Sequence, residues 1–150
     1  MLKAGDHVPD FTATIQTGET VSLQDFRGQK LILFIYPASG TPSCTVENCS
    51  LRDGYADLKA QGYALLGVSP DSVKKQQNFI QKNSLPFSLI ADKDNEVIKL
   101  FGAWGEKQMY GKTYEGVLRS TFIINENAEI TQVIEKVDTK NHAQQILAAL

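Results

Sequence analysis

Two cysteines, Cys44 and Cys49, are the side chains with the clearest chemical potential in this chain of 150 residues. They stand five residues apart, and the sequence contains no other cysteine. A loop rich in proline, glycine and serine, residues 37–42, precedes Cys44, and a helix is expected to begin close to it. Free backbone N–H groups and the positive end of the helix dipole favour a thiolate at such a position. Since the thiolate is the nucleophilic form, the placement predicts a reactive Cys44.

The loop before Cys44 contributes further residues that can shape a site around the sulfur. Thr41 lies three residues upstream, so its hydroxyl can turn back toward the sulfur or toward a bound oxygen. Pro37 and Pro42 stiffen the loop and can shield the sulfur from bulk water. The plainer alternative is that Cys44 is a small buried side chain, which is the commoner fate of a free cysteine. The strand–loop–helix placement and the nearby second cysteine favour the reactive interpretation.

A continuous helix would keep the two sulfurs apart. Five residues correspond to about 7.5 Å of rise and roughly 140° of rotation. A disulfide needs Cα atoms within about 7 Å of each other and Cβ atoms that face each other. If Cys44 and Cys49 bond, the first turns of the helix must therefore unwind.

The elements that must position these cysteines alternate between strands and helices. Strands are expected at 11–15, 20–23, 30–36, 63–69, 87–90, 120–125 and 130–137, with the first two and the last two forming hairpins. Helices are expected at about 44–61, 70–83, 97–104 and 143–150. The continuous apolar run 30–36 is typical of a strand that is covered on both faces. This order predicts an α/β fold with a central mixed sheet flanked by helices.

Length and composition restrict the class of protein. A chain of 150 residues predicts a single domain over 1–150, and 42% hydrophobic residues exclude wholesale disorder. A net charge of −2 argues against binding to nucleic acid or an anionic membrane. The longest apolar run is too short to span a membrane, and the N-terminus lacks a secretory signal, so a cytoplasmic protein is expected. Two cysteines and two isolated histidines, His7 and His142, predict no metal site, and both histidines are expected at the surface.

The residues around Cys44 resemble a peroxiredoxin. Pro37, Thr41 and Cys44 match the family pattern Pro-x-x-x-Thr-x-x-Cys at every fixed position. Within the family, the chain is similar to the bacterioferritin comigratory protein, or peroxiredoxin Q, branch. The similar stretches are residues 41–47 with Cys49 and residues 51–53, residues 2–6, 101–107 and 109–116, and Arg119 with Phe122. The resemblance implies a thioredoxin-like fold, to which the strand pattern of residues 11–23 adds an N-terminal β-hairpin, and a thiol peroxidase that needs no cofactor.

The resemblance also implies roles for the matched residues. Cys44 would be the peroxidatic cysteine and Cys49 the resolving cysteine. Thr41 and Arg119 would complete the pocket around Cys44, and Pro37 would shield it. A solvated cation at the start of a strand is the plainer alternative for Arg119.

Three other positions bear on the same site. Glu47 matches a recurrent acidic position of the branch and would support the hydrogen bonds of the site, although a favourable charge in a first helical turn would also explain it. Ser43 stands where the branch usually has glycine, which affects how freely the start of the helix rearranges. Ala38 stands where the branch often has lysine, so a nearby positive charge is missing.

The expected reaction follows from these roles. The thiolate attacks a peroxide oxygen, Cys44 becomes a sulfenic acid, and Cys49 condenses with it to a disulfide. An external dithiol, thioredoxin or another reductant, restores both thiols. The expected substrates are hydrogen peroxide and organic hydroperoxides, and a monomer is the expectation for the branch.

Three alternatives remain at this point. Disulfide exchange without peroxide would need two sulfurs in one helical turn, and the chain has no Cys-x-x-Cys. A redox-switched sensor or holdase would use the same cysteine pair but turn over little substrate. A non-catalytic domain with incidental cysteines would react slowly with peroxide.

Overall fold

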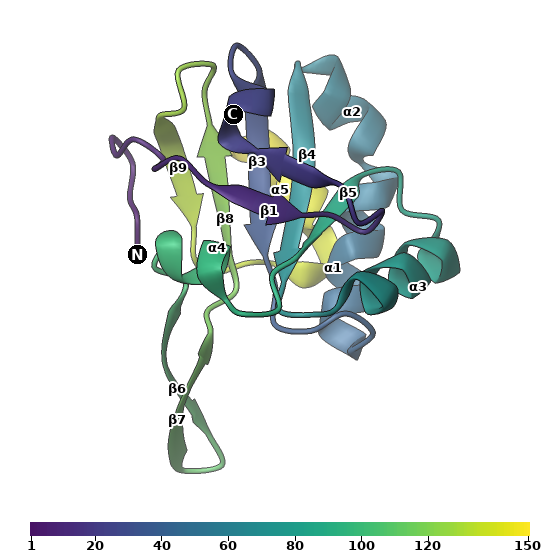
Figure 1. The fold of residues 1–150 in the computed structure, drawn as a ribbon, viewed down its shortest axis with the longest axis vertical. Coiled ribbons are helices and arrows are strands. Elements are labelled where there is room, and N and C mark those ends of the chain that lie inside the picture. Colours follow the sequence, from purple (N-terminus) through teal and green to yellow (C-terminus); the bar gives the residue numbers. More distant parts are fainter.

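The computed structural model describes the backbone of residues 1–150 and every side chain except that of Met109. A five-stranded sheet with the order β5-β4-β3-β8-β9 forms its centre (Figure 1). Strands β3 (Lys30–Ile35), β4 (Tyr63–Ser69) and β5 (Ser88–Ala91) are parallel. Strands β8 (Ser120–Ile124) and β9 (Ile130–Ile134) add antiparallel pairs. The expected mixed sheet is confirmed.

The apolar run of β3 is buried on both faces of this sheet, as its sequence predicts. Leu31, Leu33 and Ile35 belong to one hydrophobic cluster, and Ile32 and Phe34 belong to the other. The alternation follows from the two-residue period of a strand. The second cluster continues from β3 through Tyr36 to Cys44, so the chain that leaves the strand stays anchored in the core up to the cysteine.

Helices cover the face that holds the second cluster. They are α1 (Pro42–Asp53), α2 (Tyr55–Ala60), α3 (Val73–Asn83) and α5 (His142–Ala149), the last preceded by the short η2 (Thr139–Asn141) (Figure 1). The opposite face packs against α4 (Glu96–Leu100), η1 (Leu23–Phe26) and the N-terminal hairpin of β1 (Thr12–Thr14) and β2 (Thr20–Ser22). The N-terminal hairpin is confirmed.

The single helix expected at 44–61 is wrong in one respect, because it is two helices. The chain breaks at Gly54, between α1 and α2. A Cβ atom at Gly54 would lie 2.3 Å from the Cβ of Ala143, so the glycine lets α5 approach the break closely. The helix also begins two residues earlier than expected, at Pro42.

Besides the two expected hairpins, the structure has one between residues 104 and 117 that was not expected from the sequence. Strands β6 (Trp104–Met109) and β7 (Lys112–Val117) pair antiparallel and project from the body of the fold (Figure 1). Tyr110 and Gly111 close the turn, with φ values of 53° and 77°. The helix expected at 97–104 accordingly ends at Leu100. Most of β7 is exposed, so it lacks the burial pattern by which strands are usually recognised.

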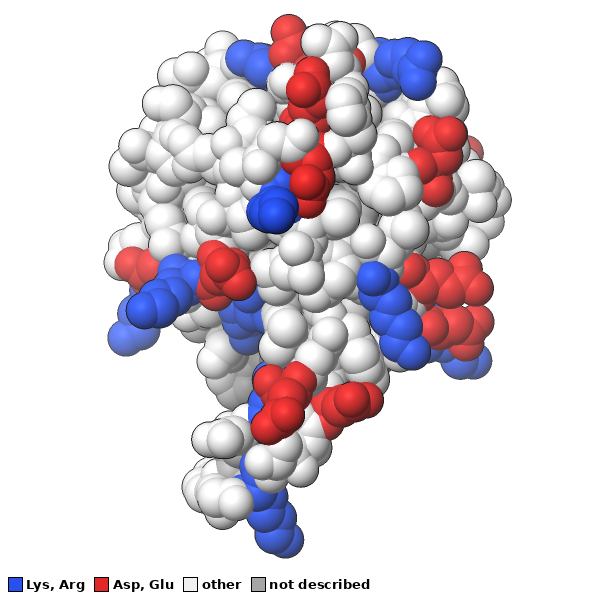
Figure 2. Space-filling model, turned by 90° about the vertical axis from the view of Figure 1, so that its left-hand side faces the viewer, with Lys and Arg blue, Asp and Glu red and all other residues white. Residues whose placement is uncertain are grey.

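The surface carries charges of both signs. Acidic and basic side chains are interspersed over the face shown in Figure 2, including on the projecting hairpin at the bottom of the view. Among the described residues, no helix combines the length and apolar character that crossing a membrane requires.

Candidate active site

Cys44 lies in the first turn of α1, as its sequence predicts. Thr41 is the N-cap residue, Pro42 is the first helical residue, and the cysteine is buried with 1% of its surface exposed. The Thr41 side chain makes no capping hydrogen bond, and its hydroxyl donates to the carbonyl oxygen of Ala38 at 2.9 Å. The hydroxyl therefore does not cap the helix. The unbonded N–H groups of the first turn remain available to an anion at the helix start.

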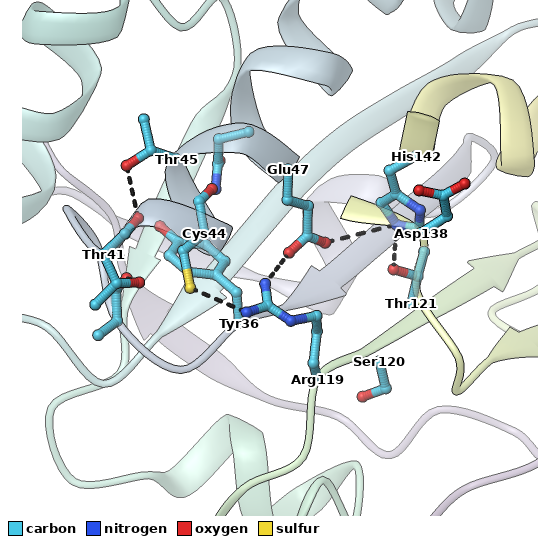
Figure 3. Close-up of polar contacts among 12 residues, drawn as sticks. Tyr36, Thr41, Cys44, Thr45, Glu47, Arg119, Ser120, Thr121, Asp138 and His142 are labelled. Carbon is cyan, nitrogen blue, oxygen red and sulfur yellow. Dashed lines mark hydrogen bonds and ion pairs between the residues drawn. The ribbon is translucent and has the colours of Figure 1, made fainter. Parts of the chain in front are cut away.

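Arg119 brings a positive charge to the sulfur. The residue directly precedes β8, and its Nη2 donates to Cys44 Sγ at 3.4 Å (Figure 3). Its Nη1 donates to Glu47 Oε1 at 2.5 Å. The guanidinium therefore contacts the sulfur and a carboxylate at once, across 75 residues of sequence.

The electrostatics of this cluster follow from burial. Burial raises the pKa of Glu47 from 4.5 to about 7, although the charge and hydrogen bond of Arg119 lower it. Burial alone would lower the pKa of Arg119, but the charges of Glu47 and Cys44 reverse this and raise it. The guanidinium thus stays charged and is placed to stabilise negative charge that develops on the sulfur during a reaction.

The second cysteine is held away from the first. Cys49 is half-buried, and its Sγ lies 3.7 Å from Asn83 Oδ1 at the end of α3. Both cysteines are free thiols, and α1 is continuous between them. The structure therefore brings Cys44 together with Arg119 and Glu47, whereas Cys49 faces a different neighbour.

Pro37 and Ser43 occupy the edges of the site. Pro37 is half-buried beside Arg119, where both line an open hollow of about 380 Å³. Ser43 is exposed in the first turn of α1. The remaining walls of the hollow are Met1, Lys107, Leu118 and Glu135.

A buried polar network beneath the loop was missed by the sequence analysis. Ser39 Oγ donates to Gln76 Oε1 at 2.7 Å and lies 2.9 Å from the Tyr36 hydroxyl. The backbone N–H of Ser39 donates to Asp71 Oδ2 at 2.7 Å. Gln76 in turn donates to Ser69 Oγ at 2.6 Å. These bonds tie the loop that leads to Cys44 to α3 and β4, so the loop remains anchored if α1 rearranges.

The expectation that His142 lies at the surface is wrong. The residue is fully buried, with its Nε2 2.7 Å from Thr121 Oγ1 and 3.6 Å from Glu47 Oε2 (Figure 3). The spacing from His142 to Ile146 is four residues, which places both on one helical face, and that signal indicates burial. His7, in contrast, is exposed as expected. Among the described residues, no three His, Cys, Asp or Glu side chains group as metal ligands would.

Replacing Glu47 by glutamine is expected to change the pH dependence of stability. Because the pKa of Glu47 is raised from 4.5 to about 7 by folding, its proton stabilises the folded chain below pH 4.5, and this stabilisation is lost as pH rises to about 7. Glu47→Gln removes that loss. Relative to the unmodified chain, its free energy of unfolding should rise by up to roughly 3 kcal/mol across this interval. Urea unfolding at a series of pH values measures it.

The exposed Glu115 provides the matched control for this prediction. Glu115→Gln should leave the pH dependence unchanged. A difference between Glu47→Gln and the unmodified chain that stays constant with pH would contradict the prediction.

Fold and site together define a class of protein. A mixed sheet flanked by helices places a buried cysteine at the start of a helix, and a guanidinium contacts its sulfur. This is a thiol-dependent peroxidase with a thioredoxin-like fold.

Comparison with known proteins places the chain within that class. Its residues 4–133 match the model of the AhpC/TSA family. It is 44% identical over 146 residues to a putative peroxiredoxin bcp of Haemophilus influenzae and 43% identical to peroxiredoxin Bcp of Escherichia coli, in each case covering 97% of this chain and 94% of the relative. The chain belongs to the AhpC/TSA family, in its Bcp, or peroxiredoxin Q, branch.

Solved structures are similar over almost the whole chain. A peroxiredoxin Q mutant of Xylella fastidiosa has a TM-score of 0.92 at 28% identity, covering 99% of this chain and 95% of that one. Peroxidoxin BcpB of Mycobacterium tuberculosis has a TM-score of 0.86 at 32% identity, covering 99% and 96%. A Xanthomonas campestris bacterioferritin comigratory protein was studied for alkyl peroxide reduction. Its structure has a TM-score of 0.87 at 33% identity, covering 93% of this chain and 88% of that one. These relatives support the peroxidase and give no support to the sensor or holdase alternative.

Proposed function

We propose that the chain reduces hydrogen peroxide and organic hydroperoxides through Cys44, forms a disulfide with Cys49, and is recycled by thioredoxin. The observation that carries the proposal is the 3.4 Å contact between Arg119 Nη2 and Cys44 Sγ in the first turn of α1. The contact combines a nucleophile with a permanent positive charge. The experiment below also shows whether a dithiol other than thioredoxin is the reductant.

The first step is attack of the Cys44 thiolate on one peroxide oxygen. A sulfur–oxygen bond forms, the oxygen–oxygen bond breaks, and an alkoxide or hydroxide leaves and takes up a proton. Arg119 and the N–H groups of the first turn are placed to stabilise the negative charge during this step. Thr41 can donate a hydrogen bond to the peroxide only if its hydroxyl leaves the carbonyl of Ala38, and Pro37 limits access of water to the sulfur.

The second step needs a rearrangement of α1. Cys49 is five residues along a continuous helix from Cys44, and its sulfur contacts Asn83. A disulfide therefore forms only after the first turns unwind and Cys49 leaves Asn83. The exposed Ser43 lies in the turn that must open. Glu47 unwinds with the same segment, so its contact with Arg119 is made only in the folded state.

The hollow beside Arg119 and Pro37 has room for the organic part of a hydroperoxide. The Xanthomonas relative was studied for alkyl peroxide reduction.

The whole chain acts as one domain over residues 1–150, without cofactor or metal. We infer a cytoplasmic monomer that does not bind nucleic acid, in keeping with the net charge of −2 and the mixed charges of Figure 2.

A coupled assay tests this function. The protein is mixed with thioredoxin, thioredoxin reductase and NADPH, and oxidation of NADPH is followed after addition of hydrogen peroxide or tert-butyl hydroperoxide. Both substrates should sustain turnover. Turnover with glutaredoxin but not with thioredoxin would replace the reductant, and no turnover above a Cys44→Ser baseline with either would overturn the proposed function.

A further inference from the structure

The second oxygen of Glu47 faces a histidine that the steps above do not use. Glu47 Oε2 is buried and accepts no hydrogen bond from any described residue. His142 Nε2 lies 3.6 Å from it and 2.7 Å from Thr121 Oγ1 (Figure 3). Glu47 and His142 both have 0% of their surface exposed. A carboxylate and an imidazole thus meet in the interior, on the side of Glu47 that does not face Arg119.

The amide of Gln145 fixes where His142 carries its hydrogen. Gln145 Nε2 donates to the carbonyl oxygen of Lys136, so Oε1 is the accepting atom, and it receives the backbone N–H of Asp138. This Oε1 lies 2.9 Å from His142 Nδ1, which must therefore be the N–H of the ring. In the neutral imidazole, Nε2 is then an acceptor: it receives the Thr121 hydroxyl and has no hydrogen to give to Glu47 Oε2. Two acceptors face each other, and one further proton turns this into a favourable contact.

We propose that Glu47 and His142 store one proton while Cys44 is a thiolate and release it when Cys44 is oxidised. This inference rests on the proposed role of Cys44. The thiolate and the Glu47 carboxylate share the single positive charge of Arg119. With a proton on the pair, the buried cluster is neutral, whereas without it the cluster carries an uncompensated negative charge.

Oxidation reverses this balance. When the thiolate becomes an uncharged sulfenic acid, Arg119 and an ionised Glu47 neutralise each other, and the stored proton is no longer favoured. In the same step the leaving alkoxide or hydroxide takes up one proton from solvent. The pair thus returns to solvent the proton that the reaction consumes, and ionisation of Cys44 is linked to protonation of the pair.

The effect of folding on the two groups supports this assignment. Burial raises the pKa of Glu47 to about 7 and lowers that of His142 to about 4. Folding therefore moves one proton from the imidazole to the carboxyl group at weakly acidic pH. Two other charged groups act on the pair directly: Arg119, and Asp138, which raises the pKa of His142. Cys44 acts on the pair indirectly, because its sulfur also contacts Arg119.

Proton uptake during a single oxidation tests the proposal. The chain with His142, the His142→Gln variant and the His7→Gln variant are all measured with Cys49→Ser, so that no disulfide forms and α1 stays folded. At about pH 6 in weak buffer, a pH indicator should report well under one proton taken up per Cys44 oxidised. His142→Gln fixes an N–H donor on Glu47 and keeps it ionised, so uptake should rise to about one proton. His7→Gln, the same change at an exposed position, should behave like the unmodified histidine.

Equal uptake with and without His142 would overturn the proton store. Sulfenic acid is measured in the same sample, so an absence of oxidation marks a failure of the proposed function instead. A second measurement, which needs no peroxide and no His142 variant, then decides. The Glu47 carboxyl is titrated by ¹³C NMR in the reduced chain and in Cys44→Ser, where no thiolate exists. Its midpoint should be lower in Cys44→Ser by on the order of one pH unit, and equal midpoints would contradict the proposal.

Discussion

Cys44→Ser should abolish peroxidase activity, whereas Cys49→Ser should keep the first reaction with peroxide and lose thioredoxin-dependent turnover. The two sulfurs differ in their surroundings: Cys44 contacts Arg119 at the start of α1, and Cys49 contacts Asn83. Arg119 donates a hydrogen bond directly to the Cys44 sulfur, where it can stabilise a thiolate and the charge that develops during attack. The charge of Arg52 also acts on Cys49, but the Cys49 thiol donates its hydrogen bond to the Asn83 side chain. Serine in place of Cys44 is a far weaker nucleophile, so no activity above the uncatalysed reaction is expected.

Two rates separate these roles. Stopped-flow measurement of peroxide consumption should give the same first-step rate for Cys49→Ser and the unmodified chain. In the coupled assay, Cys49→Ser should fall to the Cys44→Ser baseline, because the sulfenic acid has no internal thiol with which to condense. Full coupled activity in Cys49→Ser would show that an external thiol resolves Cys44 directly. A slowed first step would show instead that Cys49 helps to shape the site.

Arg119→Met should slow the reaction of Cys44 with peroxide by about 10²–10³-fold, the typical cost of removing one preorganised donor from a developing negative charge. The methionine keeps much of the length of the side chain but removes the hydrogen bonds to Cys44 and Glu47. Arg119→Lys retains the charge without the planar fork, and an intermediate rate is expected. The second-order rate constant from stopped-flow mixing measures the effect.

Stability must be compared in parallel, because Arg119→Met leaves Glu47 buried without its cation. Removal of one partner of a buried pair costs about 3–5 kcal/mol where the other stays charged, and protonation of Glu47 reduces that cost. Arg27→Met changes the same residue type at an exposed position and should leave the rate unchanged. A rate within a few-fold of normal in folded Arg119→Met would exclude the arginine from catalysis.

Much of this architecture could be predicted from local patterns. The continuous apolar run of β3 indicated a strand buried on both sides, and the position of Cys44 after a proline-rich loop indicated the first turn of a helix. Each depends on near neighbours in the sequence. The placement of Arg119 beside Cys44 came from the resemblance to peroxiredoxins, since nothing local in the sequence connects residues 75 positions apart.

The features that were missed depend on packing between distant segments. The break at Gly54 reflects the approach of Ala143, and the burial of His142 reflects its contact with Thr121 and Glu47. A glycine inside a helical pattern and a histidine four residues before Ile146 were visible in the sequence, but their partners were not. The projecting β6–β7 hairpin was missed because its exposed strands lack the alternation of a half-buried sheet.

The cooperation of Cys44 and Cys49 is tested most directly by peptide mapping under non-reducing conditions. The reduced protein is treated with one equivalent of hydrogen peroxide, digested, and analysed by mass spectrometry. A Cys44–Cys49 crosslink within one chain is the predicted result, and it requires the first turns of α1 to unwind. Sulfenic acid trapped on Cys44 with Cys49 still free would contradict the two-cysteine cycle, and two unmodified thiols would contradict the peroxidase itself.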